Sequence, residues 1–489
     1  MVKPQEDADR PSPTLPDLPL ARRLNPPATR AGGVVQVMGA VYASLGVASV
    51  AIVALLFAGK RGVLAHATAV AALALLLALT LYSLTLTPIQ DREVAADWFS
   101  LAVAVIALLD ALISVSGFWG PAGEYRYENG AYILAIAGVT GLLGVAWSGS
   151  IPVLFTSWTL FSVSSYALIA IPRDAYSASG AAKYGLMSLA ASNLLLLSLG
   201  VVAVATGSLQ LSPPASMSLA AGLGATALLL AAVGFKIGVF PFQAWLSDTY
   251  GYSDPLPVSA VAPLSKAATI LALYKLSSIL IPQAQEKWLL LVGALAVLTM
   301  TYGNVTALLQ RGLQSLLAYS SIAQAGYLLV GLAALAVPEA RRIALYGLAL
   351  QLLAYSLAKT GLFLLARTVR RHGDKPPALD ELRGLSQADP ALAASAAILA
   401  LSLMGLPPLA GFWGKLYLFL APVYAAPWLT ALALINTGIA AAYYARLLKA
   451  IYFEPGSVRL QGYRATVAAV EACAAITVVA ALIPLFIQP

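Results

Sequence analysis

Apolar residues run through almost the whole chain in long stretches, separated by short polar or Pro/Gly-rich breaks. Most stretches are long enough to cross the hydrocarbon core of a bilayer, which takes about 20 residues of helix. Counting them predicts about fourteen transmembrane helices, and hence an all-α integral membrane protein. The predicted bounds are 33–58, 63–87, 95–117, 130–148, 150–171, 183–206, 217–241, 257–282, 287–309, 312–335, 339–367, 391–420, 427–452 and 464–486.

Composition supports this class and excludes several others. Of the 489 residues, 60% are hydrophobic and only 10% are charged, whereas a soluble protein carries about 25% charged residues. One cysteine, Cys473, and two histidines, His66 and His372, leave no disulfide framework and no ligand set for a metal or redox cofactor. The first 32 residues are rich in Pro, Asp and Arg and lack a signal-peptide pattern. We expect residues 1–32 to form a disordered or surface-lying extension of a membrane domain spanning 33–489.

The distribution of basic residues predicts the orientation in the membrane. After the extension, the odd-numbered loops carry most of the lysine and arginine. The even-numbered loops hold only Arg92, Lys275, Lys287, Arg341 and Arg342. Because basic loops stay in the cytoplasm, the odd loops are predicted to be cytoplasmic and both termini external. The basic residues of the extension argue the other way, and the loops outnumber them.

Four lysines fall well inside predicted helices: Lys236, Lys266, Lys359 and Lys415. A lysine at mid-bilayer costs about 2.5–3.5 kcal/mol on insertion scales. Snorkelling, in which the long side chain carries its charge to the interface, accounts for Lys275 near a helix end. It does not account for the four, which have apolar sequence for two or more turns on at least one side. They are predicted to line a polar path inside the membrane.

Two of these lysines lie beside proline breaks. Lys236 precedes Pro241 in the seventh helix, and Lys415 follows Pro407 and Pro408 in the twelfth. Proline opens the helical hydrogen-bond ladder, and unwound backbone at membrane depth is tolerated only against protein or a watery cavity. The two breaks lie five helices apart. The spacing predicts two inverted five-helix repeats, helices 4–8 (about 130–282) and 9–13 (about 287–452), as in ion transporters.

Buried lysines can exchange protons, because desolvation disfavours the charged ammonium. Hydroxyl groups and water would have to connect them. The candidate bridging residues are Ser259, Ser265, Tyr319, Ser320, Ser321 and Tyr355, each of which could equally be a helix-packing residue. Among the acids, Asp110 is the one centred in a predicted helix.

At these residues the chain resembles a known family. "GFKIGVFPFQAWLSDTY" followed by "PLPVSAVAPLSKAA" resembles the central signature of the antiporter-like subunits of respiratory complex I. "LLAYSSIAQAGYLLVGLAAL", "LRGLSQADP" and "LSLMGLPPLAGFWGKLYLF" are similar to its tenth-helix motif, a loop motif and its broken twelfth helix. The likeness covers about residues 95–450, and the residues of the "GFK…PF" stretch favour subunit N over subunit M. The family also includes Mrp-type cation/proton antiporters and subunits of membrane-bound hydrogenases.

The resemblance implies a role for each lysine. Lys236 would be the pumping lysine and Lys266 the bridging lysine. Lys415 would exchange protons with one side of the membrane, and Lys359 looks like an eleventh-helix lysine of Mrp-type members. Two positions depart from the family pattern. Thr159 occupies the place of the fifth-helix glutamate that usually pairs with the pumping lysine. Either another acid such as Asp110 supplies the countercharge, or this subunit pumps differently or not at all. Gln243 replaces a histidine and cannot titrate.

The function implied is that of a proton-translocating membrane subunit of a complex I-type NADH/quinone oxidoreductase. The resemblance implies no cofactor in this chain. Quinone, flavin and iron–sulfur clusters would belong to partner subunits of a multi-subunit complex in a bacterial or archaeal cytoplasmic membrane. The moving ion would be the proton or sodium, with no nucleic-acid partner. Two alternatives remain open, a subunit of a sodium/proton antiporter or membrane-bound hydrogenase, and a structural spacer that has lost pumping with its glutamate.

Overall fold

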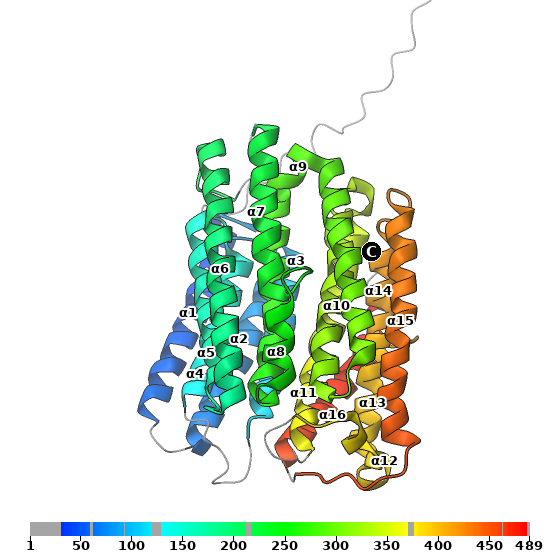
Figure 1. Ribbon diagram of the computed structural model, residues 1–489. Helices are drawn as coiled ribbons and strands as arrows, with labels where there is room; N and C mark the ends of the chain where they lie inside the picture. The colour runs from blue at the N-terminus through cyan, green and yellow to red at the C-terminus, as the bar shows by residue number, and fades with distance from the viewer. Residues whose placement is uncertain are drawn as a thin grey trace, which may run out of the picture.

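The computed structural model describes residues 31–58, 62–91, 93–119, 129–211, 217–369, 376–461 and 463–486. They form a bundle of long helices that run roughly side by side (Figure 1). Thirteen helical stretches of the described residues are long and apolar enough to span a membrane. The twelfth predicted span is the exception, because its break divides it into two shorter helices. The predicted all-α membrane fold is confirmed. The predicted extension lies outside the described residues, apart from positions 31 and 32, which begin the first helix.

Three helices precede the first predicted repeat: α1 (Ala31–Phe57), α2 (Gly62–Leu84) and α3 (Trp98–Ser116). Between α2 and α3 the chain forms two short antiparallel strands, β1 (Ile89–Gln90) and β2 (Ala95–Ala96), which the sequence did not predict. Asp97 caps α3, because its side chain accepts a hydrogen bond from the Ser100 amide. The β1–β2 turn therefore ends where the third transmembrane helix begins.

The first predicted repeat begins with α4 (Gly130–Trp147), α5 (Ile151–Ala170) and α6 (Ala175–Thr206). Its broken helix consists of α7 (Leu219–Ile237) and α8 (Ala244–Tyr252). Helix α7 ends at Gly238, which adopts a left-handed conformation with φ of 70°, a backbone shape that glycine takes without a steric penalty. The predicted break at Pro241 is confirmed.

A single helix of 55 residues, α9 (Pro255–Leu309), replaces the two helices predicted at 257–282 and 287–309. Its two spanning stretches are Pro255–Gln283 and Gln285–Leu309. Pro282 lies where they meet, and a proline inside a helix bends the chain without necessarily ending it. The helix turns over at the upper end of the bundle (Figure 1). The prediction of two separate helices is therefore wrong for the backbone but right for the number of membrane crossings.

The second predicted repeat continues with α10 (Leu313–Ala334), the 3₁₀ turn η1 (Pro338–Ala340) and α11 (Arg341–Thr368). After η2 (Leu379–Leu382) and α12 (Leu385–Ala388), its broken helix consists of α13 (Pro390–Met404) and α14 (Ala410–Leu420). The last helices are α15 (Pro427–Tyr452), α16 (Arg464–Ala480) and α17 (Ile483–Phe486). Each predicted repeat thus has a broken helix in its fourth place, and the inverted relation between them stays a prediction.

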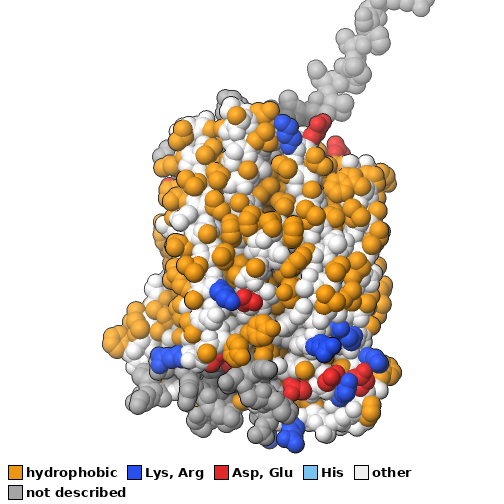
Figure 2. Space-filling model, viewed as in Figure 1, with side chains coloured by type: hydrophobic (Ala, Val, Ile, Leu, Met, Phe, Trp, Pro, Cys, Tyr) orange, Lys and Arg blue, Asp and Glu red, His pale blue; other side chains and the backbone are white. Residues whose placement is uncertain are grey.

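The surface separates an apolar wall from a charged end. Apolar side chains cover most of the visible face, and basic and acidic side chains gather toward its lower end (Figure 2). At that end Glu454 pairs with Lys449 at 3.1 Å and with Arg383 at 2.6 Å. Hydrogen bonds from Lys449 and Arg383 lower the pKa of Glu454. The most completely buried spans are the first part of α9, α10 and α11, and they carry two of the four lysines.

Candidate functional site

The four predicted lysines are all buried. Lys236, Lys266 and Lys359 have no exposed surface, and Lys415 is 3% exposed. None of them forms an ion pair with a described carboxylate. Neutral groups therefore hold each ammonium, and the nature of those groups decides how readily each lysine can gain or lose a proton.

Lys236, on α7, is held by hydroxyl groups and aromatic rings. Its Nζ donates to Ser162 Oγ on α5 at 3.0 Å and to Ser188 Oγ on α6 at 3.2 Å. The rings of Phe161 and Tyr184 each lie 4.9 Å from the ammonium, in the geometry of a cation–π contact. Such contacts accommodate an ammonium without fixing its charge with a counterion.

Neither Thr159, at the usual glutamate position, nor Asp110, the possible countercharge, contacts Lys236. The Thr159 hydroxyl donates to the carbonyl of Phe155, one turn back on its own helix, at 2.8 Å, so it is not among the described contacts of Lys236. Asp110 on α3 bonds to Thr360 on α11. The structure thus does not bring Asp110 or Thr159 to the ammonium of Lys236. Gln243 is buried beside the break, and its Oε1 has no hydrogen-bond partner among the described residues.

Lys266, on α9, points at the break in the first repeat. Its Nζ lies 3.5 Å from the carbonyl of Ile237, the last residue of α7. The last carbonyls of a helix lack partners within the helix and carry its partial negative charge. Above the ammonium, the ring of Tyr355 lies 5.3 Å away. The helix break therefore supplies a negative end where a cation is needed.

Lys415, on α14, uses the other break in the same way. Its Nζ donates to the carbonyls of Leu403 at 2.8 Å and Met404 at 3.0 Å, the last two residues of α13. The ring of Tyr327 lies 4.7 Å from the ammonium. Both broken helices thus present their carbonyl ends to a buried lysine, although Lys266 comes from the next helix and Lys415 from the same span.

Lys359, on α11, lies against α10. Its Nζ donates to the carbonyl of Leu317 at 2.7 Å and to the hydroxyl of Ser320. Helix α11 packs against α9, which carries Lys266. Two of the four lysines therefore lie on neighbouring helices at the junction of the two predicted repeats.

Polar side chains connect Lys359 with Lys415. Tyr444 on α15 is hydrogen-bonded to Ser320 at 3.1 Å and interacts with Gln324. Gln324 donates to the Leu403 carbonyl at 3.3 Å, the same oxygen that Lys415 binds. A continuous series of polar groups thus joins the two lysines across α10, α15 and the end of α13.

The connection from Lys236 to Lys266 passes through α6. Tyr184 lies over Lys236 and interacts with the side chains of Ser188 and Ser265. Ser265 directly precedes Lys266 in α9 and is hydrogen-bonded to Tyr250 at 3.0 Å. Among the described residues, no hydrogen bond joins this link to the Lys266 ammonium itself, so water would have to complete it.

The structure sorts the predicted bridging residues. Ser320 contacts Lys359, Tyr355 contacts Lys266, and Ser265 belongs to the Tyr184 link. Tyr319 instead packs its ring 6.3 Å from that of Tyr302, and Ser259 belongs to the surroundings of Asp110. Sequence reasoning missed Tyr184, Tyr444 and Gln324, because tyrosine and glutamine in an apolar helix give the same signal as packing residues.

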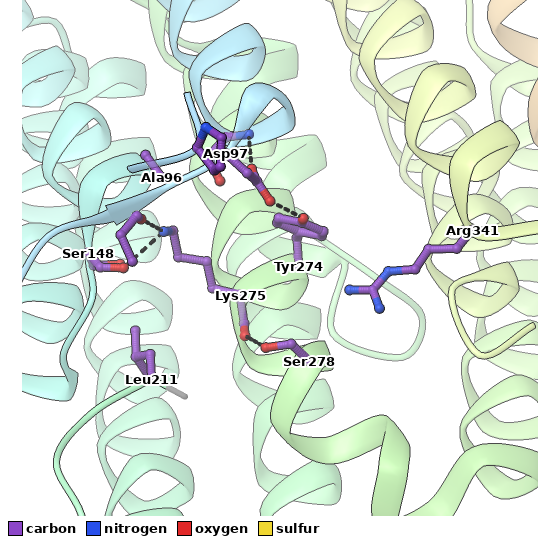
Figure 3. A pocket seen from close by; sticks show the side chains of 11 residues that line it. Ala96, Asp97, Ser148, Leu211, Tyr274, Lys275, Ser278 and Arg341 are labelled. Carbon is purple, nitrogen blue, oxygen red and sulfur yellow. Dashed lines mark hydrogen bonds between the residues drawn. The ribbon is translucent and has the colours of Figure 1, made fainter. Parts of the chain in front are cut away.

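A polar cavity of about 260 Å³ opens at the end of the bundle that carries the even-numbered loops, beside the β1–β2 turn. Figure 3 shows Lys275 reaching from α9 toward Ser148 while Arg341 enters from α11. The sequence predicts a snorkelling Lys275, whereas its Nζ donates to the carbonyls of Ala95 at 2.6 Å and Ser148 at 2.9 Å. Lys275 therefore ties α9 to two connecting segments at this end of the bundle.

The side chains around the four lysines are of types that can donate or accept protons. Among the described ranges, no cluster of three or more His, Cys, Asp or Glu side chains could hold a metal ion. Lysines, tyrosines and serines can all donate and accept protons, apart from the protonated ammonium, which only donates. The site is therefore a set of four buried lysines among hydroxyl, amide, carbonyl and aromatic groups, inside a helical membrane protein with two broken helices.

This combination defines the class of antiporter-like membrane proteins. Residues 148–440 match the family model described as "NADH:quinone oxidoreductase/Mrp antiporter, TM". Subunit N of the F(420)H(2) dehydrogenase of Methanosarcina mazei is 32% identical over 391 residues, 77% of each chain. NADH-quinone oxidoreductase subunit N of Trichlorobacter lovleyi is 30% identical over 419 residues, covering 83% of this chain and 84% of the relative.

Solved structures agree. A chain of respiratory complex I from Thermus thermophilus superposes with a TM-score of 0.77 at 30% identity, covering 91% of this chain and 98% of that one. A chain of the Mrp complex from Dietzia has a TM-score of 0.76 at 21% identity, covering 93% and 94%, which is a likeness of fold alone. The chain belongs to the NADH:quinone oxidoreductase/Mrp antiporter family, as its motifs predict.

Proposed function

We propose that this protein is the proton-translocating, subunit N-type membrane subunit of a complex I-type quinone oxidoreductase. Protons would move along the row of Lys236, Lys266, Lys359 and Lys415, coupled to quinone reduction elsewhere in the complex. The observation that carries the proposal is the burial of all four lysines among neutral groups. A buried ammonium without a counterion is costly. We therefore infer that the four buried lysines serve a function in which their charge changes.

The pair of Lys266 and Lys359 would transmit the changes. Because their charges repel, protonation of one favours the neutral amine of the other. A proton reaching Lys266 would therefore promote release from Lys359 toward Ser320, Tyr444 and the Lys415 site. The carbonyl ends of α7 and α13 would stabilise the ammonium at the two breaks, and small movements of either helix end would change proton affinity.

Partners and cofactors follow from the relatives. Their names place them in an F(420)H(2) dehydrogenase and in NADH-quinone oxidoreductases. By analogy, this chain would join other membrane subunits, and flavin, iron–sulfur clusters and quinone would bind in those partners. The end of the bundle with the basic, odd-numbered loops would face the cytoplasm, and both termini would lie outside.

A sodium/proton antiporter of the Mrp type is the second candidate. Lys359 favours it through its likeness to the eleventh-helix lysine of those proteins, and the Dietzia Mrp chain has the same fold. The two functions differ in what drives the ion: quinone reduction in the first case, and a sodium gradient in the second.

The test uses membrane vesicles that contain the whole complex. Proton uptake would be followed with a pH-sensitive dye, with NADH or reduced F(420) as donor and a soluble quinone as acceptor, in sodium-containing and sodium-free buffer. We expect uptake that starts with electron transfer and is the same in both buffers. Uptake that needs a sodium gradient and proceeds without a donor would instead support the antiporter and contradict the proposal.

A further inference from the structure

A buried acid lies outside the lysine row and is not used by the proposed path. Asp110, on α3, has no exposed surface. Its Oδ1 is hydrogen-bonded to the Thr360 hydroxyl on α11, and its Oδ2 has no hydrogen-bond partner among the described residues. An ionised carboxylate left like this in the membrane interior would be very costly.

The same Thr360 hydroxyl has a second acceptor. It lies 3.1 Å from the carbonyl oxygen of Ser259 on α9. In a regular helix that carbonyl would accept from the amide four residues on, but this residue is Pro263, which has no N–H. The Ser259 carbonyl therefore lacks its regular helical donor, and the Thr360 hydroxyl supplies one.

The number of available hydrogens favours the neutral form of Asp110. The Thr360 hydroxyl has one hydrogen and two neighbours that need one, Asp110 Oδ1 and the Ser259 carbonyl. If Thr360 donates to Ser259, the contact with Asp110 requires a hydrogen on the carboxyl group. With Asp110 neutral, the carboxyl O–H donates to the Thr360 hydroxyl, which donates to the Ser259 carbonyl. With Asp110 ionised, Thr360 donates to the carboxylate and the Ser259 carbonyl loses this donor.

No described cation compensates a charge at this place. Lys359 lies directly before Thr360 on α11, but its ammonium binds Leu317 and Ser320 on α10. The titratable groups that interact with Asp110 are the Tyr355 hydroxyl on α11 and the Cys473 thiol on α16, and neither is a cation. The Ser114 hydroxyl nearby is hydrogen-bonded to Ser259 Oγ at 2.8 Å.

We propose that Asp110 is a proton-binding site beside the lysine row, in which the carboxylic acid is held neutral by Thr360 and the proline-freed carbonyl of Ser259. Ser259 and Lys266 are seven residues apart on α9 and share one face of that helix. Tyr355 interacts with Asp110, and its ring lies 5.3 Å from the Lys266 ammonium. Exchange with Lys266 would therefore run by way of Tyr355: the carboxyl O–H breaks, an N–H forms on the neutral Lys266 amine, and a carboxylate and an ammonium result without change in net charge.

The protonated state of Asp110 is independent of the proposed function, and only the exchange with the lysines rests on it. Infrared difference spectroscopy of the complex in lipid discs tests the first part. The spectrum of the wild type minus that of Asp110→Asn is expected to contain the C=O stretch of a carboxylic acid, shifted in D₂O. A Thr360→Val change should shift this band, and Thr360→Ser should leave it in place. Carboxylate stretches in this difference spectrum, with no carboxylic acid band, would show an ionised Asp110 and overturn the proposal.

The exchange is tested by redox-driven proton uptake in vesicles. Asparagine has the shape of a neutral aspartic acid, so we expect Asp110→Asn to assemble at wild-type levels and to lower proton uptake per electron severalfold. If Asp110→Asn kept wild-type uptake and the wild type showed the infrared band, the exchange with the lysines would be contradicted. The protonated state of Asp110 would still stand. If the wild type itself showed no redox-driven uptake, the proposed function would fail and the infrared result would still decide the state of Asp110.

Discussion

Replacing Lys359 with methionine is expected to lower redox-driven proton uptake by about tenfold or more, since a positioned proton-transfer group contributes roughly 10²–10⁴-fold to a rate. Methionine fills a similar volume, but it cannot donate to Leu317 or Ser320 and cannot carry a proton. The series of polar groups from α11 to the Lys415 site would then lose its first member.

Uptake would be measured together with quinone reduction in the same vesicles. Lys183→Met is the matched control, because Lys183 is a half-exposed lysine paired with Asp248 at 2.5 Å, outside the buried row. We expect the control to keep wild-type uptake. Equal uptake in Lys359→Met and Lys183→Met, at normal assembly, would contradict a path through Lys359.

Replacing Lys415 separates structure from proton exchange. Lys415→Met leaves the carbonyls of Leu403 and Met404 without the ammonium that they accept from. Hydrogen bonds to a charged group contribute about 1.5–3 kcal/mol each, so we expect a lower unfolding temperature as well as lost uptake. Lys415→Arg can restore donors at the end of α13, but arginine does not release its proton in proteins.

The arginine variant should therefore recover much of the thermal stability and none of the proton uptake. The first is measured by fluorescence-detected unfolding of the purified complex, the second in vesicles. Full uptake in Lys415→Arg would mean that Lys415 serves only as a fixed charge holding the break in α13.

The membrane fold could be predicted from sequence because the length of an apolar stretch is set by the thickness of the bilayer. The broken helices were equally readable, since Pro241 and the Pro407–Pro408 pair cannot continue a hydrogen-bond ladder. The continuity of α9 could not be read, because Pro282 either ends or bends a helix depending on its packing. The two-residue strands β1 and β2 are too short to leave a periodic pattern.

The site was predictable only in part. Charge in an apolar run identified the four lysines, and all four are buried. Their surroundings were not predictable, because serine and tyrosine in helices give no signal of which neighbour they face. The Thr159 position shows the limit of motif reasoning: the family pattern aligned it with a glutamate, but its hydroxyl binds its own helix, and Ser162 and Ser188 hold Lys236 instead.

The most direct test of proton transport through the buried row is the Lys236→Met variant in vesicles that hold the whole complex. Electron transfer and proton uptake would be recorded together, beside Lys183→Met, with and without sodium. We expect redox-driven uptake per electron to fall while the complex still assembles, despite threonine at position 159. Unchanged uptake in an assembled complex would contradict a pumping role for Lys236 and would leave the subunit as a structural spacer.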